Sequence, residues 1–381
     1  MPRIELPISK SIANRLLILQ AIHGDGLMTV SADLPDDVRI MSEAIRRLGE
    51  RREARIDLSN CGTAMRFLTA YCAQLEGQTT ILDGVERMRH RPIGQLVDAL
   101  REIGADIEYL GEEGFPPLRI KGCILDKHRM VTINNPQSTQ FVSALLLIGA
   151  NVQTHSTSPY ITLTCEMIKN KEQGTKNKDK LLTTDQTPVT NLGSLLLAPY
   201  SEIERDWSSA AFWYEYVALH GGEIKLPGLH KESLQGDKVV ANIFAHLGVH
   251  TTYTAEGIIL SPIAYSEASY SPLSGRPIAA QAASHSKILV QDFGNCPDLY
   301  PAVALTCERL GVELHATGVE SLPLKESDRL RAVREHRTDA DHRMAMALLV
   351  AGYEVNDTAC ISKSYPQFLG QLHRINTLKL Q

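Results

Sequence analysis

Apolar positions along most of this chain alternate between helical spacing and short β-like runs. Ile12, Leu16 and Leu19, for example, recur at the spacing of one helix face. Regular alternation of helices with strands is the pattern of an α/β protein. Because 381 residues exceed one ordinary hydrophobic core, the sequence predicts about two domains.

A weak internal repeat supports this division. Residues 97–120 and residues 239–263 each predict a helix, a corner containing Gly, a strand, a Gly-containing turn and a second strand. Two distant copies of one unit favour two domains with the same construction. The breaker pair Pro227-Gly228 precedes the second copy, and we therefore expect a domain boundary near Pro227.

Two segments interrupt the pattern. Residues 169–191 are polar and rich in Lys, Asn and Thr, which predicts a surface loop. The helix predicted at residues 330–336 runs directly into Thr338-Asp339-Ala340-Asp341-His342, with no pair of strands after it. One α/β unit is therefore expected to lack its second half.

Bulk composition excludes several functional classes. With 43% hydrophobic and 22% charged residues the chain is typical of a soluble globular protein. A net charge of −5 gives no indication of nucleic-acid binding, so basic residues gathered at one place would form a local cluster. We find neither a charged-then-apolar leader nor an apolar run of about 18 residues, and expect no signal peptide and no membrane span.

The seven cysteines are odd in number, scattered, and never spaced as Cys-x-x-Cys. This pattern favours reduced thiols in a cytoplasm over a disulfide framework or a zinc site. Cys61 and Cys296 lie beside candidate site motifs, and we interpret both as packed side chains rather than nucleophiles.

The candidate chemistry lies at helix starts. Ser9-Lys10-Ser11 precedes an apolar helix and places a cation and hydroxyl groups in its first turn. Helix N-termini present unpaired N–H groups and partial positive charge, which suit phosphates and carboxylates. The same arrangement recurs at Asn60-Cys61-Gly62-Thr63-Ala64-Met65-Arg66, Ser138-Thr139-Gln140-Phe141, Lys325-Glu326-Ser327-Asp328-Arg329 and Asp341-His342-Arg343-Met344.

Each motif by itself also has a plain structural interpretation. The turn at Gly62 allows close backbone approach to a ligand, but it is also an ordinary start of a helix. Asp298, after Pro297, is either a helix-dipole partner or a general base for a substrate hydroxyl. Residues 325–329 are either a charged turn with internal pairs or a carboxylate held among cations.

Other chemistries have less support. The sequence contains no P-loop and no Gly-x-Gly-x-x-Gly after a strand. It also lacks a His-Glu-x-x-His zinc motif and a Gly-x-Ser-x-Gly nucleophile elbow.

Taken together and in this order, the motifs resemble those of the 5-enolpyruvylshikimate-3-phosphate synthase family. The resemblance extends from Leu6 to about Leu372. It rests on Leu-Pro-x-Ser-Lys-Ser-x-x-Asn-Arg, Gly-Thr-Ala-Met-Arg, Arg-Pro-Ile-Gly, Ser-Thr-Gln-Phe, Pro-Asp, Lys-Glu-Ser-Asp-Arg and Asp-His-Arg-Met-Ala-Met.

This resemblance implies an α/β protein of enolpyruvyl transferase fold, with two similar domains of repeated βαβαββ units, buried helices and outer sheets. Two chain crossovers, near Pro7 and Pro227, would give a first domain at residues 8–227 and a second at residues 1–7 plus 228–381. The active site would lie in the cleft between domains. The missing half-unit implies that the second domain is shortened.

The resemblance also implies a function. The family transfers the enolpyruvyl group of phosphoenolpyruvate to the 5-hydroxyl of shikimate 3-phosphate, on the shikimate pathway to chorismate and aromatic amino acids. It implies no metal, no organic cofactor, no nucleic acid or membrane partner, and a cytoplasmic monomer. The alternatives are carboxyvinyl transfer to UDP-N-acetylglucosamine on the same fold, and a catalytically inactive binding relative.

Site residues follow from the resemblance position by position. Asp298 would deprotonate the attacking hydroxyl, Glu326 would protonate the methylene carbon and later remove a proton, and Lys10 would assist phosphate release. Phosphoenolpyruvate would contact Lys10, Gly62, Thr63, Arg91, Gln140, Arg329, Arg343 and Lys363. Shikimate 3-phosphate would contact Lys10, Ser11, Arg15, Ser138, Thr139, Gln140, Ser209, Asp298 and Lys325, with His342, Asn60 and Ser321 nearby. Phe67 and Phe212 depart from the family pattern, which usually has a small or aliphatic residue and a tyrosine there.

Overall fold

The protein forms two compact units. In this computed structural model the described residues are 1–24, 27, 31, 33–50, 52–176, 203–263 and 288–379. The first unit comprises Lys10–Ala32 and Asp36–Ile203, and the second comprises Met1–Ser9, Asp33–Pro35 and Glu204–Gln381. The division at Ile203 differs from the boundary expected near Pro227, because helix α9 (Trp207–His220) is buried in the core of the second unit.

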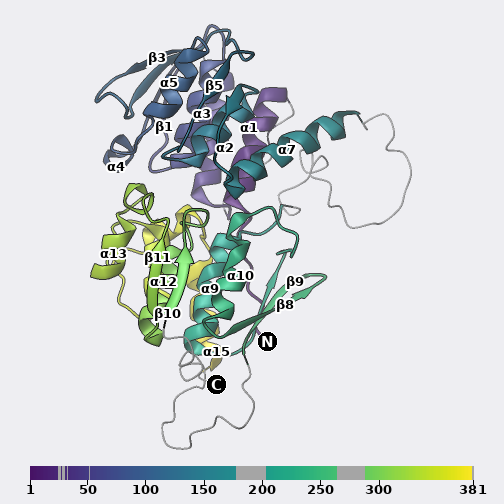
Figure 1. The fold of residues 1–381 in the computed structure, drawn as a ribbon, viewed down its shortest axis with the longest axis vertical. Helices are drawn as coiled ribbons and strands as arrows, with labels where there is room; N and C mark the ends of the chain where they lie inside the picture. Colours follow the sequence, from purple (N-terminus) through teal and green to yellow (C-terminus); the bar gives the residue numbers. More distant parts are fainter. Residues whose placement is uncertain are drawn as a thin grey trace, which may run out of the picture. The chain divides into compact units, whose positions relative to one another are not determined.

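The first unit contains one complete βαβαββ unit (Figure 1). Its sheet has the order β1-β2-β4-β3, with β1 parallel to β2 and with β4 antiparallel to both β2 and β3. The helices of this unit connect its strands. In chain order its elements are β1 (Glu53–Asp57), α3 (Gly62–Ala73), β2 (Thr79–Asp83), α4 (Glu86–Arg89), α5 (Gly94–Glu102), β3 (Asp106–Tyr109) and β4 (Leu118–Lys121).

The other described elements of the first unit are four helices and a small parallel sheet. They are α1 (Lys10–His23), α2 (Asp36–Glu50), β5 (Met130–Thr132), α6 (Thr139–Leu147), β6 (Asn151–Gln153) and α7 (Pro159–Lys176), with β5 parallel to β6. The spacing at Ile12, Leu16 and Leu19 predicts a one-sided helix, but α1 is buried over consecutive residues from Ile12 to Gln20.

The surface loop predicted at residues 169–191 is wrong at its start. Residues 169–176 continue helix α7, and Lys169 Nζ pairs with Glu166 Oε1 at 2.8 Å, three residues earlier on the helix. Such i,i+3 pairs stabilise an exposed helical segment whose composition is too polar to indicate a helix by hydrophobic periodicity. The remainder of that prediction lies outside the described residues.

The second unit repeats the construction. Helix α9 is followed by β7 (Ile224–Pro227), η2 (Gly236–Val239), α10 (Val240–Ala245), β8 (Val249–Thr254) and β9 (Gly257–Pro262), with sheet order β7-β9-β8. Arg3 forms a parallel bridge with Lys225 of β7, where the first strand of a complete unit would lie. The two copies of the sequence repeat are the α5-β3-β4 and α10-β8-β9 segments.

The last α/β unit is shortened, as the sequence predicts. Strand β10 (Ile288–Asp292), helix α12 (Tyr300–Leu310), strand β11 (Glu313–Thr317) and helix α13 (Arg329–Glu335) form its first half, with β10 parallel to β11. No strand follows β11 in described residues 318–379. Positive φ angles at His336, Asp339 and Ala340 turn the chain directly into α14 (His342–Val350). The chain continues through η6 (Ala359–Lys363) and α15 (Phe368–Lys379).

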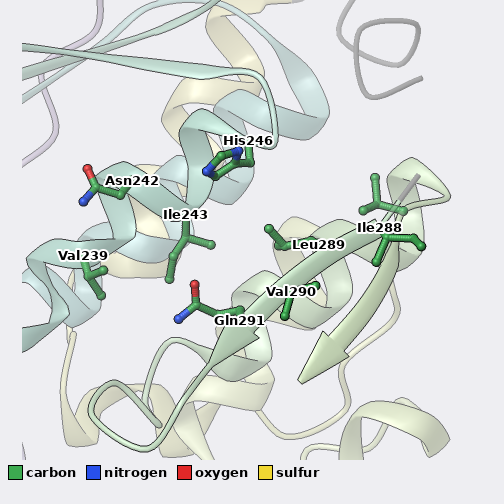
Figure 2. Close-up of a pocket in the computed structure, with 9 residues that line it drawn as sticks. Val239, Asn242, Ile243, His246, Ile288, Leu289, Val290 and Gln291 are labelled. Atoms are coloured by element: carbon green, nitrogen blue, oxygen red, sulfur yellow. The ribbon is translucent and has the colours of Figure 1, made fainter. Parts of the chain in front are cut away.

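A hollow of about 260 Å³ lies beside strand β10 (Figure 2). Ile243 of α10 and His246, which follows α10, line one side of it, and Leu289 and Gln291 of β10 line another. None of the residues that the sequence places in the active site lines this hollow.

Helices form the core of the second unit, and α9 carries one acidic residue within it. Both carboxyl oxygens of Glu215 are buried and make no hydrogen bond among the described residues. Burial without a partner disfavours the charged form and raises the pKa of Glu215 well above its usual range. Among the helices described, none has the length and apolar character to cross a bilayer.

We expect Glu215→Gln to make the protein more stable than wild type at pH 8, and expect this difference to shrink to less than about 1 kcal/mol at pH 5. The native state keeps the Glu215 proton at pH values where the unfolded state has lost it. The free energy of unfolding of wild type therefore falls by about 1.4 kcal/mol per pH unit from about pH 4.5 up to the folded-state pKa. Urea unfolding at both pH values tests this, with exposed Glu223→Gln as the control. A pH-independent difference would contradict it.

Candidate active site

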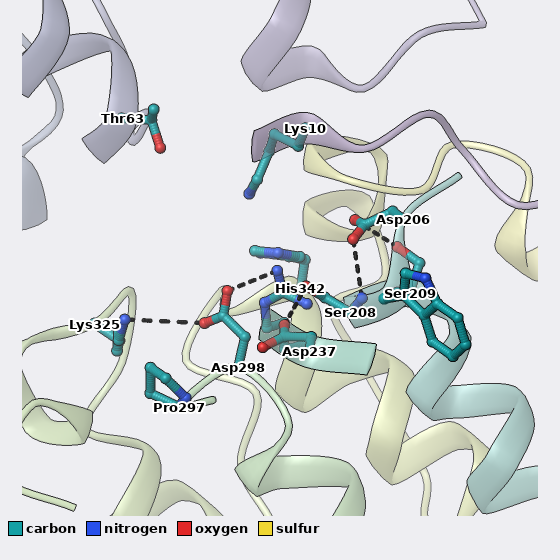
Figure 3. A network of polar contacts seen from close by, with 12 residues as sticks. Lys10, Thr63, Asp206, Ser208, Ser209, Asp237, Pro297, Asp298, Lys325 and His342 are labelled. Carbon is teal, nitrogen blue, oxygen red and sulfur yellow. Dashed lines mark hydrogen bonds and ion pairs between the residues drawn. The ribbon is translucent and has the colours of Figure 1, made fainter. Parts of the chain in front are cut away.

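Asp298 lies just before α12 and is surrounded by cations (Figure 3). Its Oδ2 is 2.8 Å from Arg343 Nη2, and its Oδ1 is 2.8 Å from Arg329 Nη1 and 3.9 Å from Lys325 Nζ. Burial alone would raise the pKa of Asp298, but Arg343, Lys325 and Arg329 together hold it well below its usual range. Asp298 is therefore ionised at neutral pH.

Glu326 belongs to the same network. Its Oε1 accepts a hydrogen bond from Lys363 Nζ at 2.9 Å, and its Oε2 accepts one from Arg329 Nη2 at 3.1 Å. Arg329 is also 2.8 Å through Nε from Asp341 Oδ2. Burial alone would lower the pKa of Arg329, but Asp341, Asp298 and Glu326 raise it above its ordinary value. One buried guanidinium thus holds three carboxylates.

Helix caps fix where these arginines lie. Asp328 precedes α13 and accepts a hydrogen bond from the backbone N–H of Arg331 at 3.1 Å. Asp341 caps α14 in the same way through the N–H of Arg343 at 2.9 Å. Each cap places an arginine in the first turn of its helix, where the helix dipole adds positive potential.

The serines at the start of α9 are held by two aspartates. Asp206 caps the helix, accepting from the N–H of Ser208 at 2.9 Å and from the hydroxyl of Ser209 at 3.0 Å. The hydroxyl of Ser208 donates to Asp237 (Figure 3). The capping residue is therefore Asp206, and Ser209 is oriented by it.

Two further residues predicted from the resemblance lie on neighbouring elements of the second unit. His342 is fully buried in the first turn of α14. Ser321 precedes the short turn η5 (Leu322–Leu324), four residues before Lys325.

In the first unit, Lys10 opens α1 and pairs with a buried carboxylate. Its Nζ lies 2.8 Å from Oδ2 of Asp37, whose side chain is 3% exposed. Asp37 comes from the first turn of α2, where an acidic residue is favoured by the helix dipole. Asp37 therefore fixes the position of the Lys10 ammonium group.

Gly62 is the first residue of α3, and two guanidinium groups lie close to it. A Cβ atom added to Gly62 would lie 2.5 Å from Nη1 of Arg91 and would also meet Nη1 of Arg66. Arg91 is buried, and its Nε and Nη1 have no hydrogen-bond partner among the described residues. The N-terminus of α3 and the two arginines together form a site suited to an anion.

If Arg91 holds phosphoenolpyruvate, as the resemblance implies, Gly62→Ala should raise the KM for it by about 10-fold or more, because the added methyl group displaces Arg91 and weakens a charge-assisted contact. Steady-state kinetics with saturating acceptor tests this. Gly49→Ala is the matched control, since a Cβ on that helical glycine meets nothing within 4 Å. Equal KM values for the two variants would show that a methyl group at position 62 does not disturb the contact between Arg91 and the substrate.

Helix α6 brings hydroxyl and amide groups to the start of α3. Ser138 caps α6 by accepting from the N–H of Gln140 at 3.3 Å, and Thr139 is the first helical residue. The amide of Gln140 donates to Thr63 Oγ1 at 3.0 Å. Asn60 lies in the turn just before Gly62.

Arg15 is held by its own helix and by α7. It donates to the carbonyl oxygen of Ser11 at 2.8 Å, to Thr164 Oγ1 at 2.7 Å and to the carbonyl oxygen of Tyr160 at 3.1 Å. It also donates to Ser143 Oγ of α6 at 3.3 Å. Ser11 and Arg15 thus share one helix face, as their spacing predicts.

Ion pairs join the predicted acids and cations around Arg329 into one cluster in the second unit. In the first unit Lys10, Thr63 and Arg15 form smaller clusters, each with its own partners. The sequence analysis missed residues that hold these clusters rather than belong to the motifs. Asp37, Asp206 and Asp237 are the clearest, and acidic residues at helix starts were the available signal. Cys296 is buried with a raised pKa, in keeping with a packed side chain.

Comparisons with known proteins agree with this architecture. A sequence model described as EPSP synthase (3-phosphoshikimate 1-carboxyvinyltransferase) matches residues 50–372. A 3-phosphoshikimate 1-carboxyvinyltransferase of Bacteroides fragilis (strain YCH46) is 36% identical over 419 residues, covering 97% of this chain and 94% of that protein. One from Colwellia psychrerythraea (strain 34H) is 28% identical, covering 98% and 96%.

A solved structure of EPSP synthase from Acinetobacter baumannii matches with a TM-score of 0.62 at 18% identity, covering 98% of this chain and 95% of that chain. The fold is thus that of the enolpyruvyl transferases. With the family model matched over most of its length, the chain belongs to the EPSP synthase family.

Proposed function

We propose that this protein transfers the enolpyruvyl group of phosphoenolpyruvate to the 5-hydroxyl of shikimate 3-phosphate and releases phosphate. The reaction belongs to the shikimate pathway to chorismate and the aromatic amino acids. The observation that carries the proposal is the network joining Asp298 and Glu326 to Arg329, Arg343 and Lys363. It places two carboxylates suited to proton transfer among cations suited to an anionic substrate.

Phosphoenolpyruvate carries a phosphate and a carboxylate, and each needs fixed cations. Arg329, Arg343 and Lys363 would supply them from the second unit. Lys10, Gly62, Thr63, Arg91 and Gln140 would supply charge and N–H groups from the first. These cations already pair with Asp298 and Glu326, so a bound substrate would compete for them. Asp298 and Glu326 would then lose part of the positive charge that surrounds them.

Shikimate 3-phosphate needs both cations and neutral donors for its hydroxyls. Ser11, Arg15, Ser138, Thr139 and Gln140 would provide these in the first unit. Ser209, Asp298 and Lys325 would provide them in the second, with the Ser209 hydroxyl already oriented by Asp206.

The proton transfers follow from the two carboxylates. Asp298, ionised at neutral pH, would accept the proton of the 5-hydroxyl as its oxygen bonds to C2 of phosphoenolpyruvate. Glu326, in its protonated form, would deliver its proton to C3 and then take one back from C3 as the C2–O bond to phosphate breaks. The proton accepted by Asp298 would leave on the phosphate, which regenerates both carboxyl groups. Lys10 would stabilise the departing phosphate, and the net products are the enolpyruvyl ether and inorganic phosphate.

Calorimetric titration tests this proposal. We expect shikimate 3-phosphate to bind, and its presence to strengthen the binding of phosphoenolpyruvate, because both ligands favour the same state of the protein. Absence of binding for both ligands at millimolar concentration, with a cooperatively folded protein, would contradict the proposal.

The Ser138-Thr139-Gln140 motif and residues 325–329 argue against carboxyvinyl transfer to UDP-N-acetylglucosamine. With that acceptor in place of shikimate 3-phosphate, we expect no release of phosphate from phosphoenolpyruvate.

We also propose that the protein acts as a cytoplasmic monomer. Its seven cysteines are free thiols, as a reducing compartment would keep them. Light scattering of the purified protein measures its mass in solution, and a mass of twice 42.1 kDa would contradict the monomer.

A further inference from the structure

Arg15 is a buried cation with neutral partners. Its side chain is 2% exposed, and within the described residues it forms no ion pair with a carboxylate. Its four hydrogen bonds run to two hydroxyl and two carbonyl oxygens, which leaves one of the five N–H donors of a guanidinium for a ligand. Burial lowers the pKa of Arg15 to about 10.

The ring of Phe67 lies against this guanidinium. Cζ of Arg15 is 5.3 Å from the ring centroid, within the range of a cation–π contact. Phe67 is 1% exposed and comes from α3, the helix that begins at Gly62. The negative face of the ring offers Arg15 an electrostatic partner in a region where the contacts above provide only neutral acceptors.

A small or aliphatic residue at position 67 would remove the aromatic ring that lies beside the Arg15 guanidinium. The hydrogen bonds of Arg15 hold the N–H groups of its guanidinium, and the Phe67 ring adds a contact of a different kind, with the guanidinium carbon lying over the ring. The hydrogen bonds and the ring contact together restrict the position of the guanidinium group.

We propose that Phe67 is a positioning residue for Arg15 and thereby sets the affinity for the anionic acceptor substrate. The proposal rests on the proposed function, in which Arg15 contacts shikimate 3-phosphate. Phe67 is 1% exposed and would act through Arg15 rather than on the substrate directly. It acts by holding the guanidinium in place against its ring.

Fluorinated phenylalanines incorporated at position 67 test this. Successive fluorination weakens the negative ring face with little change of shape, so a packing role and an electrostatic role separate. We expect the Kd for shikimate 3-phosphate, measured by calorimetry, to rise stepwise to about 5- to 30-fold at the most fluorinated ring. The KM for shikimate 3-phosphate should rise in parallel while kcat changes little.

The same series at Phe244 is the matched control. That ring is fully buried in the second unit and packs against Tyr214 at 5.6 Å rather than against a cation. Its fluorination should leave the Kd unchanged. If wild type binds shikimate 3-phosphate but the Kd does not change along the series at position 67, the role of Phe67 is overturned and the proposed function stands. Failure of wild type to bind shikimate 3-phosphate overturns the proposed function together with this inference.

Discussion

Glu326→Gln should reduce turnover by about 10²-fold or more while both substrates still bind, because glutamine keeps the shape of the side chain but cannot carry a proton. The carboxylate is held by Lys363 at 2.9 Å and by Arg329 at 3.1 Å, so its geometry is fixed before any substrate arrives. The amide can still accept one of these hydrogen bonds. Turnover should therefore fall much more than affinity does.

Rapid-quench measurement of a single turnover, together with calorimetric Kd values, separates the two effects. Glu320→Gln, at an exposed glutamate in the same unit, is the control and should keep wild-type kinetics. Near wild-type turnover in Glu326→Gln would remove this residue from the proton transfers.

Asp341→Asn should lower the free energy of unfolding by about 3 kcal/mol. Removing one partner of a buried ion pair typically costs about 3–5 kcal/mol, and the lower end applies because Asp298 and Glu326 still neutralise Arg329. Asp341 is fully buried, and it accepts from Arg329, from Ser327 and from the N–H of Arg343. Asparagine can still cap α14, so the decrease in the free energy of unfolding reports the loss of the negative charge alone.

Asp328→Asn provides the comparison, since Asp328 caps α13 without an ion pair to Arg329. It should change stability by less than about 0.5 kcal/mol, because asparagine caps helices about as well as aspartate does. Urea unfolding of both variants at pH 7 measures the difference. Equal losses would show that Asp341 acts only as a helix cap.

Local sequence signals predicted much of the fold. Residues 97–120 and 239–263 repeat one pattern because each builds a helix and two strands within about 25 residues, where neighbouring positions determine the structure. The missing half-unit after Arg329 was visible for the same reason. The domain boundary was predicted near Pro227 rather than at Ile203, because the sequence of α9 does not show which domain the helix packs into. Its packing depends on segments that are distant in the sequence.

Some features of the candidate site could likewise be predicted from local sequence, and others could not. Lys10, Gly62, Glu326 and Arg343 lie in short motifs and could be identified from the sequence. The pairing of Asp37 with Lys10 could not be predicted, because the two lie 27 residues apart and only the fold brings them together. The contact between Phe67 and Arg15 joins two helices in the same manner.

Release of inorganic phosphate from phosphoenolpyruvate, measured with and without shikimate 3-phosphate on freshly purified protein, tests the central claim most directly. We predict release that requires both substrates, which would also show that the shortened second unit supports catalysis. No release from a cooperatively folded protein that binds both ligands would contradict the assignment and indicate an inactive member of the family.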